Sequence, residues 1–278
     1  CSRPQVVFIP GWSSSAALAA LGWCRRNDVP AIIMSDSQEM DSPRKAWQEW
    51  IKGWIVRNGS AALVAGRRHR EYAMTLGMPA DQIAEGYDVV DNEYFIERSD
   101  AIRFGTDNPT AGQSLPRCYL LASARFVPKK NLFRLLDAFA DARRQLPEMW
   151  SLVILGDGEL RFGIEARIQA LGIEEWVLLP GFKQYDELPV YFGRAEAFVL
   201  ASTTEQWGLV VNEAMASALP VLVSERCGCA PDLVIEGETG FTFPPEAVTA
   251  LSERMLRVMR MPPEERRCRG EAARRQIV

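Results

Sequence analysis

Two glutamates, Glu205 and Glu213, lie on either side of Gly208 in one short stretch of the chain. The apolar run Ala197–Leu200 before them is typical of a buried strand in a parallel sheet, and a helix is expected to begin at Leu209. A carboxylate can accept two hydroxyl hydrogen bonds from a vicinal diol, and backbone N–H groups at a helix start can hold a phosphate. We interpret the glutamates as a diol-binding pair, and not as a general acid and base, in a site for a nucleotide sugar.

Two cations, Arg125 and Lys130, follow another expected strand, Arg117–Ala122. Arg125 comes just past the strand end, and Lys130 lies where the next helix starts. A helix dipole and free N–H groups add to such charges, so the pair predicts a cradle for a diphosphate. The alternative is a solvated loop with two surface cations.

A Gly-Asp-Gly turn, Gly156–Gly158, follows the expected strand Ser151–Leu155. It lacks the third glycine of the dinucleotide-binding fingerprint. Either the glycines let the backbone approach a ligand, or the turn is purely structural.

The motifs required for several other kinds of catalysis are absent from the sequence. The chain has no P-loop, no H-E-x-x-H and no G-x-S-x-G, and its one histidine, His69, lies among charged residues where a solvated helix position is expected. No Asp-x-Asp occurs to hold a divalent cation, so the positive charge must come from Arg125, Lys130 and helix dipoles. We expect a metal-independent protein without a cofactor.

Composition describes an ordinary globular protein. A net charge of -4 argues against a general nucleic-acid binder, and the six cysteines lack zinc spacing, so reduced, structural cysteines in a cytoplasmic protein are expected. No apolar run has the length of a membrane-spanning helix, and no signal peptide is recognisable. Because the chain opens on Cys1 and ends within a charged, helix-like segment, we expect a fragment of a longer protein.

Strand-like and helix-like segments alternate along the chain, which predicts an α/β fold with parallel sheets. The composition of Arg98–Pro116 is typical of a linker. We place a domain boundary near Gly112, which predicts a partial, acceptor-side Rossmann-like domain over 1–112, a donor-binding Rossmann-like domain over 113–260 and a truncated helical segment over 261–278.

A helix is expected after Ser42 as N-cap and Pro43 at the first helical position. One stripe of this helix is apolar: Trp47, Trp50, Ile51, Trp54 and Ile55. Its basic flanks leave two interpretations. The stripe either meets a membrane surface or lipid-linked substrate, or packs on the domain's own sheet, and Gly53 and Glu49 favour packing.

The stretch E-Q-W-G-L-V-V-N-E-A-M-A resembles the E-x7-E motif of the retaining glycosyltransferases of family 4, which have the GT-B fold. Trp207 stands where the family usually has Phe, and Ala124-Arg125…Lys130 is similar to the family's G-R-x4-K. The Gly156–Gly158 turn, Pro180-Gly181-Phe182 and Gly237–Phe241 follow in the family's order. The first domain resembles the family only in layout.

The resemblance implies two Rossmann-like domains facing across a cleft, and a donor that is a UDP-, GDP- or ADP-sugar. Arg125 and Lys130 would neutralise the diphosphate, Glu205 would contact the transferred sugar and Glu213 the ribose. The Trp207, Gly208 and Leu209 backbone would lie near the phosphate, Gly156 beside the ligand, and Phe182 and Lys183 beside the nucleobase. The acceptor would be a glycan, a lipid-linked sugar or a small molecule.

The chain departs from the family in its first domain. The family often has a histidine at the end of a strand there, whereas Ala31–Met34 leads into Ser35 and Asp36, which are the candidates to replace it. We expect the family's glycine-rich loop and its last crossing helix to lie outside this sequence. The alternatives are an epimerase or phosphorylase of the same fold, or a non-catalytic nucleotide-sugar-binding module.

Overall fold

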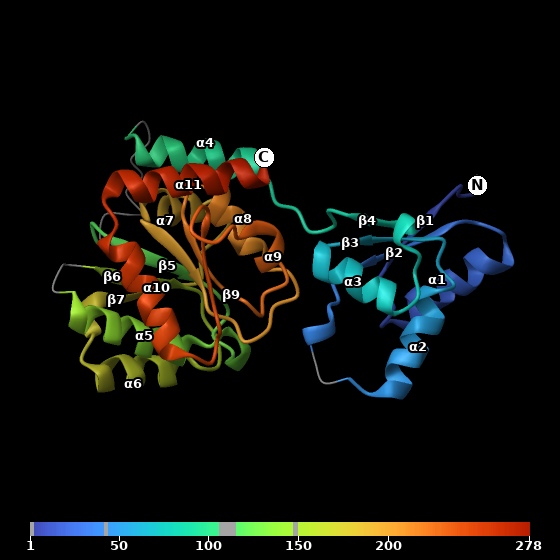
Figure 1. Ribbon diagram of the computed structural model, residues 1–278, viewed down its shortest axis with the longest axis horizontal. Helices are drawn as coiled ribbons and strands as arrows, with labels where there is room; N and C mark the ends of the chain where they lie inside the picture. Colours follow the sequence, from blue (N-terminus) through green and yellow to red (C-terminus); the bar gives the residue numbers. More distant parts are fainter. Residues whose placement is uncertain (1–2, 42–43, 106–114, 147–149) are drawn as a thin grey trace. The chain divides into compact units, whose positions relative to one another are not determined.

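The computed structural model describes residues 3–41, 44–105, 115–146 and 150–278 (Figure 1). It forms two compact units, Cys1–Val89 and Val90–Val278. The boundary expected near Gly112 lies outside the described residues. The units divide earlier, because helix α4 (Asn92–Arg103) packs against α7 (Leu188–Arg194) and α8 (Leu209–Ala216) of the C-terminal unit.

The N-terminal unit contains a parallel sheet of four strands in the order β1-β2-β3-β4. The strands are β1 (Val7–Pro10), β2 (Ala31–Ser35), β3 (Ala61–Val64) and β4 (Ile83–Glu85), and the helices are α1 (Ser15–Arg26), α2 (Ala46–Val56) and α3 (Arg67–Thr75). Ile9, Ile33 and Val64 are buried, as the alternating strand pattern requires.

Helix α2 packs through a different face from the one expected. Ser42 and Pro43 lie outside the described residues, and the helix begins at Ala46. Of the predicted apolar stripe only Ile55 is buried, while all three tryptophans are exposed. Gly53 explains the difference, since a Cβ there would lie 3.0 Å from the carbonyl oxygen of Leu76 and the bare backbone lets the helix approach on that side.

The expectation for His69 was wrong. Its side chain is buried, and with Trp12, Ser35 and Val64 it lines a small cavity. Because α3 starts directly after β3, its first turn lies at the carboxyl edge of the sheet, and the histidine on that turn faces inward while its arginine neighbours carry the surface charge.

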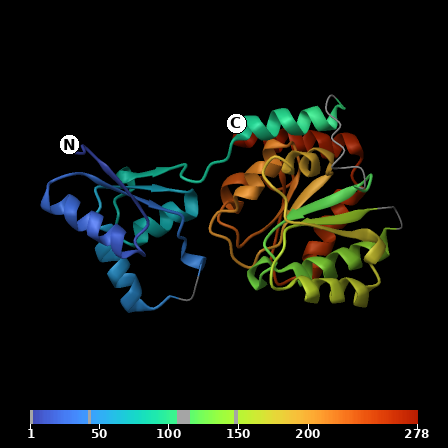
Figure 2. The same ribbon diagram turned by 180° about the vertical axis from the view of Figure 1, so that it is seen from behind.

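The C-terminal unit contains a parallel sheet of six strands in the order β10-β9-β8-β5-β6-β7. Its strands are β5 (Tyr119–Ser123), β6 (Ser151–Leu155), β7 (Val177–Gly181), β8 (Ala197–Leu200), β9 (Val221–Ser224) and β10 (Gly240–Phe243). The remaining helices are α5 (Leu132–Gln145), α6 (Arg161–Leu171), α9 (Ala230–Leu233), α10 (Val248–Arg260) and α11 (Pro263–Ile277). Helices α4, α7, α8 and α11 cover one face, and α5, α6 and α10 the other (Figures 1 and 2).

Part of the expected linker is helical. Helix α4 runs on to Arg103, its N-cap Asp91 accepts a hydrogen bond from the Tyr94 N–H, and Phe95, Ser99 and Ile102 are buried at helical spacing. Because most residues of this helix are polar, the spacing of its buried residues is not recognisable in the sequence. Among the described residues, no helix has both the length and the apolar character needed to cross a membrane.

Candidate functional site

The strand order of the C-terminal sheet creates a switch point between β5 and β8. The chain builds β5, β6 and β7 outward on one side and β8, β9 and β10 outward on the other, which is the order of a Rossmann sheet. In such sheets ligands bind at the carboxyl edge, where loops diverge from the switch point. The loops after β5 and β8 carry Arg125, Lys130 and Glu205, so the expected site residues lie at this edge.

Lys130 and Glu205 contact each other across the switch point. The Lys130 ammonium forms an ion pair with Glu205 Oε2, and each side chain is 13% exposed. Ser202 Oγ donates to the same oxygen at 3.1 Å, and Lys129 Nζ lies 3.6 Å from Oε1. The carboxylate is therefore fixed by side chains from both loops. Charged hydrogen bonds of this kind are stronger than neutral ones.

The buried residue Asn131 joins the two loops and is one that the sequence analysis gave no role. Its side-chain amide donates to the carbonyls of Ala201, at 3.0 Å, and Pro245, at 2.8 Å. Its backbone is left-handed, with φ of 59°, a conformation that asparagine tolerates better than most residues. The sequence signal for this role is an asparagine immediately before an amphipathic helix, because the left-handed backbone of Asn131 leads the chain into α5.

The Gly156–Gly158 turn supports the loop that carries Arg125. Phe126 N–H donates to the Asp157 carbonyl at 2.8 Å, and a Cβ at Gly156 would lie 1.9 Å from the Ala124 carbonyl oxygen. The glycines therefore allow two loops to approach, which supports the structural interpretation of the turn. Arg125 itself is exposed, and within the described residues its side chain makes no ion pair.

Helix α8 starts at the same edge. Gly208, its N-cap, has φ of 109°, which suits glycine, and the first N–H groups of a helix have no intrahelical partner. Trp207 is buried and its Nε1 donates to Asn212 Oδ1 at 2.9 Å, so a phosphate near it would meet backbone and not the indole ring. The arrangement at Gly208 and Leu209 suits an anion.

Glu213 lies farther along α8 and differs from Glu205 electrostatically. Burial raises its pKa to about 7, and no described residue forms a hydrogen bond or ion pair with its carboxylate. Its charge in turn helps to raise the pKa of Tyr185, after burial and Asp91. Hydroxyl groups of a ligand that donate hydrogen bonds to such a buried carboxylate would stabilise its charged form.

Phe182 and Lys183 follow β7, at the far side of the edge. Phe182 is 68% exposed, an unusual position for a large aromatic ring. Lys183 Nζ lies 3.2 Å from Glu187 Oε1 and 5.6 Å from the Tyr191 ring centroid. The loop thus presents an open aromatic face while its lysine is tied to α7.

The first-domain candidates lie in the N-terminal unit. Ser35 ends β2 and is buried, and its Oγ accepts a hydrogen bond from the Ser37 N–H at 3.2 Å. Burial raises the pKa of Asp88, and Asp36 raises it further, whereas His69 lowers it. No group of three or more His, Cys, Asp or Glu side chains within the described ranges could hold a metal ion.

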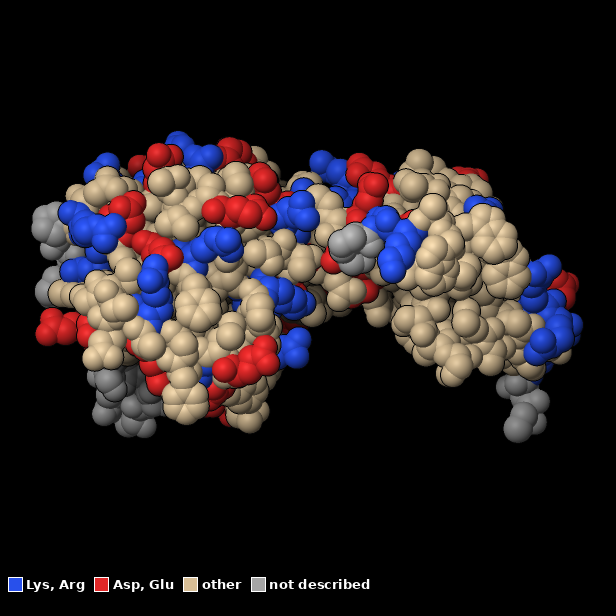
Figure 3. All heavy atoms as spheres, turned by 90° about the horizontal axis from the view of Figure 1, so that it is seen from below, with Lys and Arg blue, Asp and Glu red and all other residues tan. Residues whose placement is uncertain are grey.

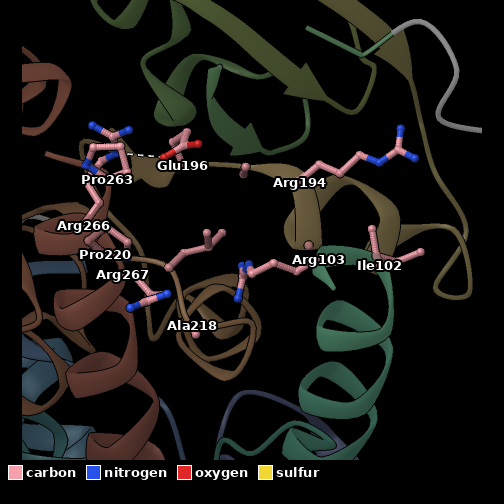
Figure 4. A pocket seen from close by; sticks show the side chains of 12 residues that line it. Ile102, Arg103, Arg194, Glu196, Ala218, Pro220, Pro263, Arg266 and Arg267 are labelled. Carbon is pink, nitrogen blue, oxygen red and sulfur yellow. Dashed lines mark hydrogen bonds and ion pairs between the residues drawn. The ribbon is translucent and has the colours of Figure 1, made fainter. Parts of the chain in front are cut away.

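A hollow of about 440 Å³ lies at the opposite, amino edge of the C-terminal sheet (Figure 4). It is rich in arginine, but these side chains have structural partners. Arg266 pairs with Glu196 at 2.7 Å, and Arg103 donates to the Ser217 carbonyl at 2.7 Å, where a cation stabilises the C-terminus of α8. We therefore place the candidate site at the carboxyl edge.

Comparisons with known proteins identify the family of the chain. The family model "Glycosyl transferases group 1" matches residues 111–276, the range that holds all the candidate donor-site residues. Alpha-D-kanosaminyltransferase of Streptomyces kanamyceticus is 25% identical over 232 residues, which are 81% of this chain and 58% of that protein. The GDP-mannose-dependent alpha-(1-6)-phosphatidylinositol monomannoside mannosyltransferase of Mycolicibacterium smegmatis is 31% identical over 131 residues, 45% of this chain and 34% of that protein.

The fold is also that of known structures. The crystal structure of HepE from Anabaena, in complex with UDP and glucose, matches with a TM-score of 0.75 and 18% identity over 98% of this chain and 72% of that one. The two parallel sheets are thus Rossmann-like units of the GT-B type. The chain spans 58% and 34% of the lengths of the two curated relatives. The match over most of the C-terminal unit shows that the chain belongs to the family of group 1 glycosyl transferases.

Proposed function

We propose that the protein is a retaining glycosyltransferase of family 4, which moves a hexose-type sugar from a nucleoside diphosphate sugar to an acceptor. The observation that carries this proposal is the Lys130–Glu205 ion pair at the switch point, beside the start of α8. A cation, a hydroxyl acceptor and an anion-binding helix start lie in neighbouring loops. A nucleotide sugar requires all three groups.

Each residue has a role in this proposal. Arg125, Lys130 and the N–H groups at the start of α8 neutralise the diphosphate, first in the bound donor and then as leaving group. Glu205 accepts hydrogen bonds from the transferred sugar, Glu213 from the ribose, and Phe182 lies against the base. The reaction needs no metal ion or cofactor, because protein cations and N–H groups carry the positive charge.

Donor binding changes the partners of Lys130. Without donor its charge is compensated by Glu205. When the diphosphate arrives the ammonium can bridge phosphate and carboxylate, while Glu205 retains lone pairs for sugar hydroxyls. Front-face attack then lets the leaving phosphate take the acceptor proton, so neither glutamate must act as nucleophile or base. The positioned charges lower the barrier only as far as they bind the transition state more tightly than the ground state.

The substrates are proposed by class. One relative is named for GDP-mannose and one structure holds UDP and glucose, so the nucleoside of the donor is left as uridine, guanosine or adenosine. We assign the acceptor, a glycan, a lipid-linked sugar or a small molecule, to the N-terminal unit. We place the protein in the cytoplasm, at the inner face of a membrane when its acceptor is a lipid.

Donor turnover tests the proposal. We would measure consumption of UDP-, GDP- and ADP-hexoses with and without added acceptors, by the unchanged chain and by Glu205→Gln and Lys130→Ala. Each variant should lose at least about tenfold in rate, since charged hydrogen bonds contribute about 1.5–3 kcal/mol. The anomeric configuration of the product should equal that of the donor, and a chelator should not change the rate.

The matched control is Arg144→Gln, a surface cation on α5 paired with Asp141, and its rate should stay unchanged. Equal rates in all variants would contradict the proposed site. Saturable donor binding with no turnover for any acceptor would instead indicate a non-catalytic module.

A further inference from the structure

The N-terminal unit carries a row of tryptophans that its own core does not use. On α2, Trp47, Trp50 and Trp54 are 60%, 69% and 51% exposed. Their spacing places them on one stripe of the helix, together with the exposed Ile51. The helix is held by its other side, through Gly53, Ile55 and Val56.

The apolar surface continues onto the neighbouring helix. A groove of about 570 Å³ separates α1 from α2, and Leu18 and Leu21 line it opposite Ile51 and Trp54. Leu18 and Trp23 of α1 are exposed as well. Seen from below, the N-terminal unit presents a broad face of uncharged side chains, with charged ones gathered at its borders (Figure 3). Contiguous apolar surface of this kind indicates an interaction site.

The charges around this surface are mainly basic. Arg25 and Arg26 line one end of the groove, and Lys45 is exposed just before α2. The acidic residue of α2, Glu49, is already engaged, because it lies 2.9 Å from Lys52 Nζ and accepts a hydrogen bond from the Tyr72 hydroxyl at 2.7 Å. The charged residues of α2 and of the groove that pair with no described carboxylate are therefore Arg25, Arg26 and Lys45, all of them basic.

We propose that this α1–α2 face docks on the surface of an anionic lipid bilayer. Tryptophan favours the level of the lipid headgroups, where its ring is buried and its N–H is solvated, and the basic border matches acidic headgroups. An apolar stripe with Trp and flanking Lys and Arg is the pattern of a helix lying in the membrane interface. The face lies in the unit that does not hold the candidate donor site, so this inference does not depend on the proposed function.

Vesicle binding tests the inference. The full chain would be sedimented with vesicles of phosphatidylcholine alone and with vesicles in which about a third of the lipid is phosphatidylglycerol. We expect binding to the second kind, weakened by salt, with a blue shift of tryptophan fluorescence. Trp47→Ser/Trp50→Ser/Trp54→Ser should lower the partition coefficient at least about tenfold, and Arg25→Gln/Arg26→Gln/Lys45→Gln by about fivefold for each cation removed.

Two variants of the other unit serve as controls. Phe162→Ser removes a ring that is also highly exposed, and Arg144→Gln removes a surface cation, and neither should change the partition coefficient. Thermal unfolding checks that every variant folds. Equal partitioning of all variants, or no binding of the unchanged chain to either vesicle, would overturn the inference. A dimer in solution that the tryptophan substitutions dissociate would overturn it too, because the face would then belong to a second copy.

Discussion

Lys130 and Glu205, which are far apart in the sequence, form an ion pair at the switch point of the C-terminal sheet. The pair joins the loop after β5 to the loop after β8, and Thr203 N–H reinforces the junction by donating to the Lys129 carbonyl at 2.8 Å. Two motifs that the sequence places apart are thus parts of one site. Their coupling has consequences for stability as well as for ligand binding.

The ion pair should show up as energetic coupling. Lys130→Ala leaves the Glu205 charge mostly buried without its main partner, so we expect a loss of about 1–2 kcal/mol in the free energy of unfolding. Glu205→Gln should cost a similar amount. The double variant should cost about 1 kcal/mol less than the sum, measured by urea unfolding of all four proteins. Strictly additive losses would show that the two side chains do not interact.

Gly156 should be intolerant of any side chain. A Cβ there would lie 1.9 Å from the Ala124 carbonyl oxygen, and φ is 122°, so Gly156→Ala must displace the loop that carries Arg125. We expect a loss of more than about 3 kcal/mol in the free energy of unfolding. Gly172→Ala is the control, because φ there is 66° but no atom lies within 4 Å, and it should cost only about 1–2 kcal/mol. Equal losses would mean that backbone strain, and not loop contact, explains the requirement.

Glu213 should make stability depend on pH. Its pKa rises from 4.5 to about 7 in the fold, so the folded protein favours the protonated form, and this contribution is lost as pH rises through 7. Glu213→Gln removes the buried charge and should raise the free energy of unfolding at pH 8 by up to about 3 kcal/mol. The gain should shrink as the pH falls toward 4.5. Denaturant unfolding at both pH values measures it, and a gain that does not vary with pH would exclude this origin.

Phe182 should contribute to nucleotide affinity by stacking on the base. Truncation to alanine should weaken binding of the cognate nucleoside diphosphate by about 1–3 kcal/mol, with little change in thermal stability because the ring is exposed. Phe162→Ala, which removes another exposed ring, should leave affinity unchanged. Calorimetric titration compares the two, and equal effects would remove Phe182 from the site.

Sequence predicted the elements of the C-terminal unit where pattern and burial agree. Ser151–Leu155 and Ala197–Leu200 are strands with the predicted bounds, because a strand buried on both faces is a continuous apolar run. The placement of the motif residues at one edge of the sheet followed from the parallel topology, because the carboxyl ends of parallel strands lie at the same edge. The contact between Lys130 and Glu205 did not, since only the strand order makes their loops neighbours.

The errors have physical causes in tertiary packing. Apolar periodicity located α2 but misidentified its packing face, because Gly53 allows close approach that no count of apolar residues reveals. The same limit hid the burial of His69, whose neighbours in sequence are charged but whose side chain lines a small, mainly apolar cavity. The side-chain amide of Asn131 donates to carbonyls of two other loops, and the sequence could not predict these bonds because it does not show that the three loops are neighbours.

The central claim is that the switch point of the C-terminal sheet binds the diphosphate of a nucleotide sugar. Calorimetric titration of UDP, GDP and ADP into the unchanged chain, Arg125→Gln and Arg144→Gln tests it most directly. We predict saturable binding of one nucleotide, weakened at least about tenfold by Arg125→Gln and unaffected by Arg144→Gln. Absence of binding by all three nucleotides, or equal affinity in the two variants, would contradict the account.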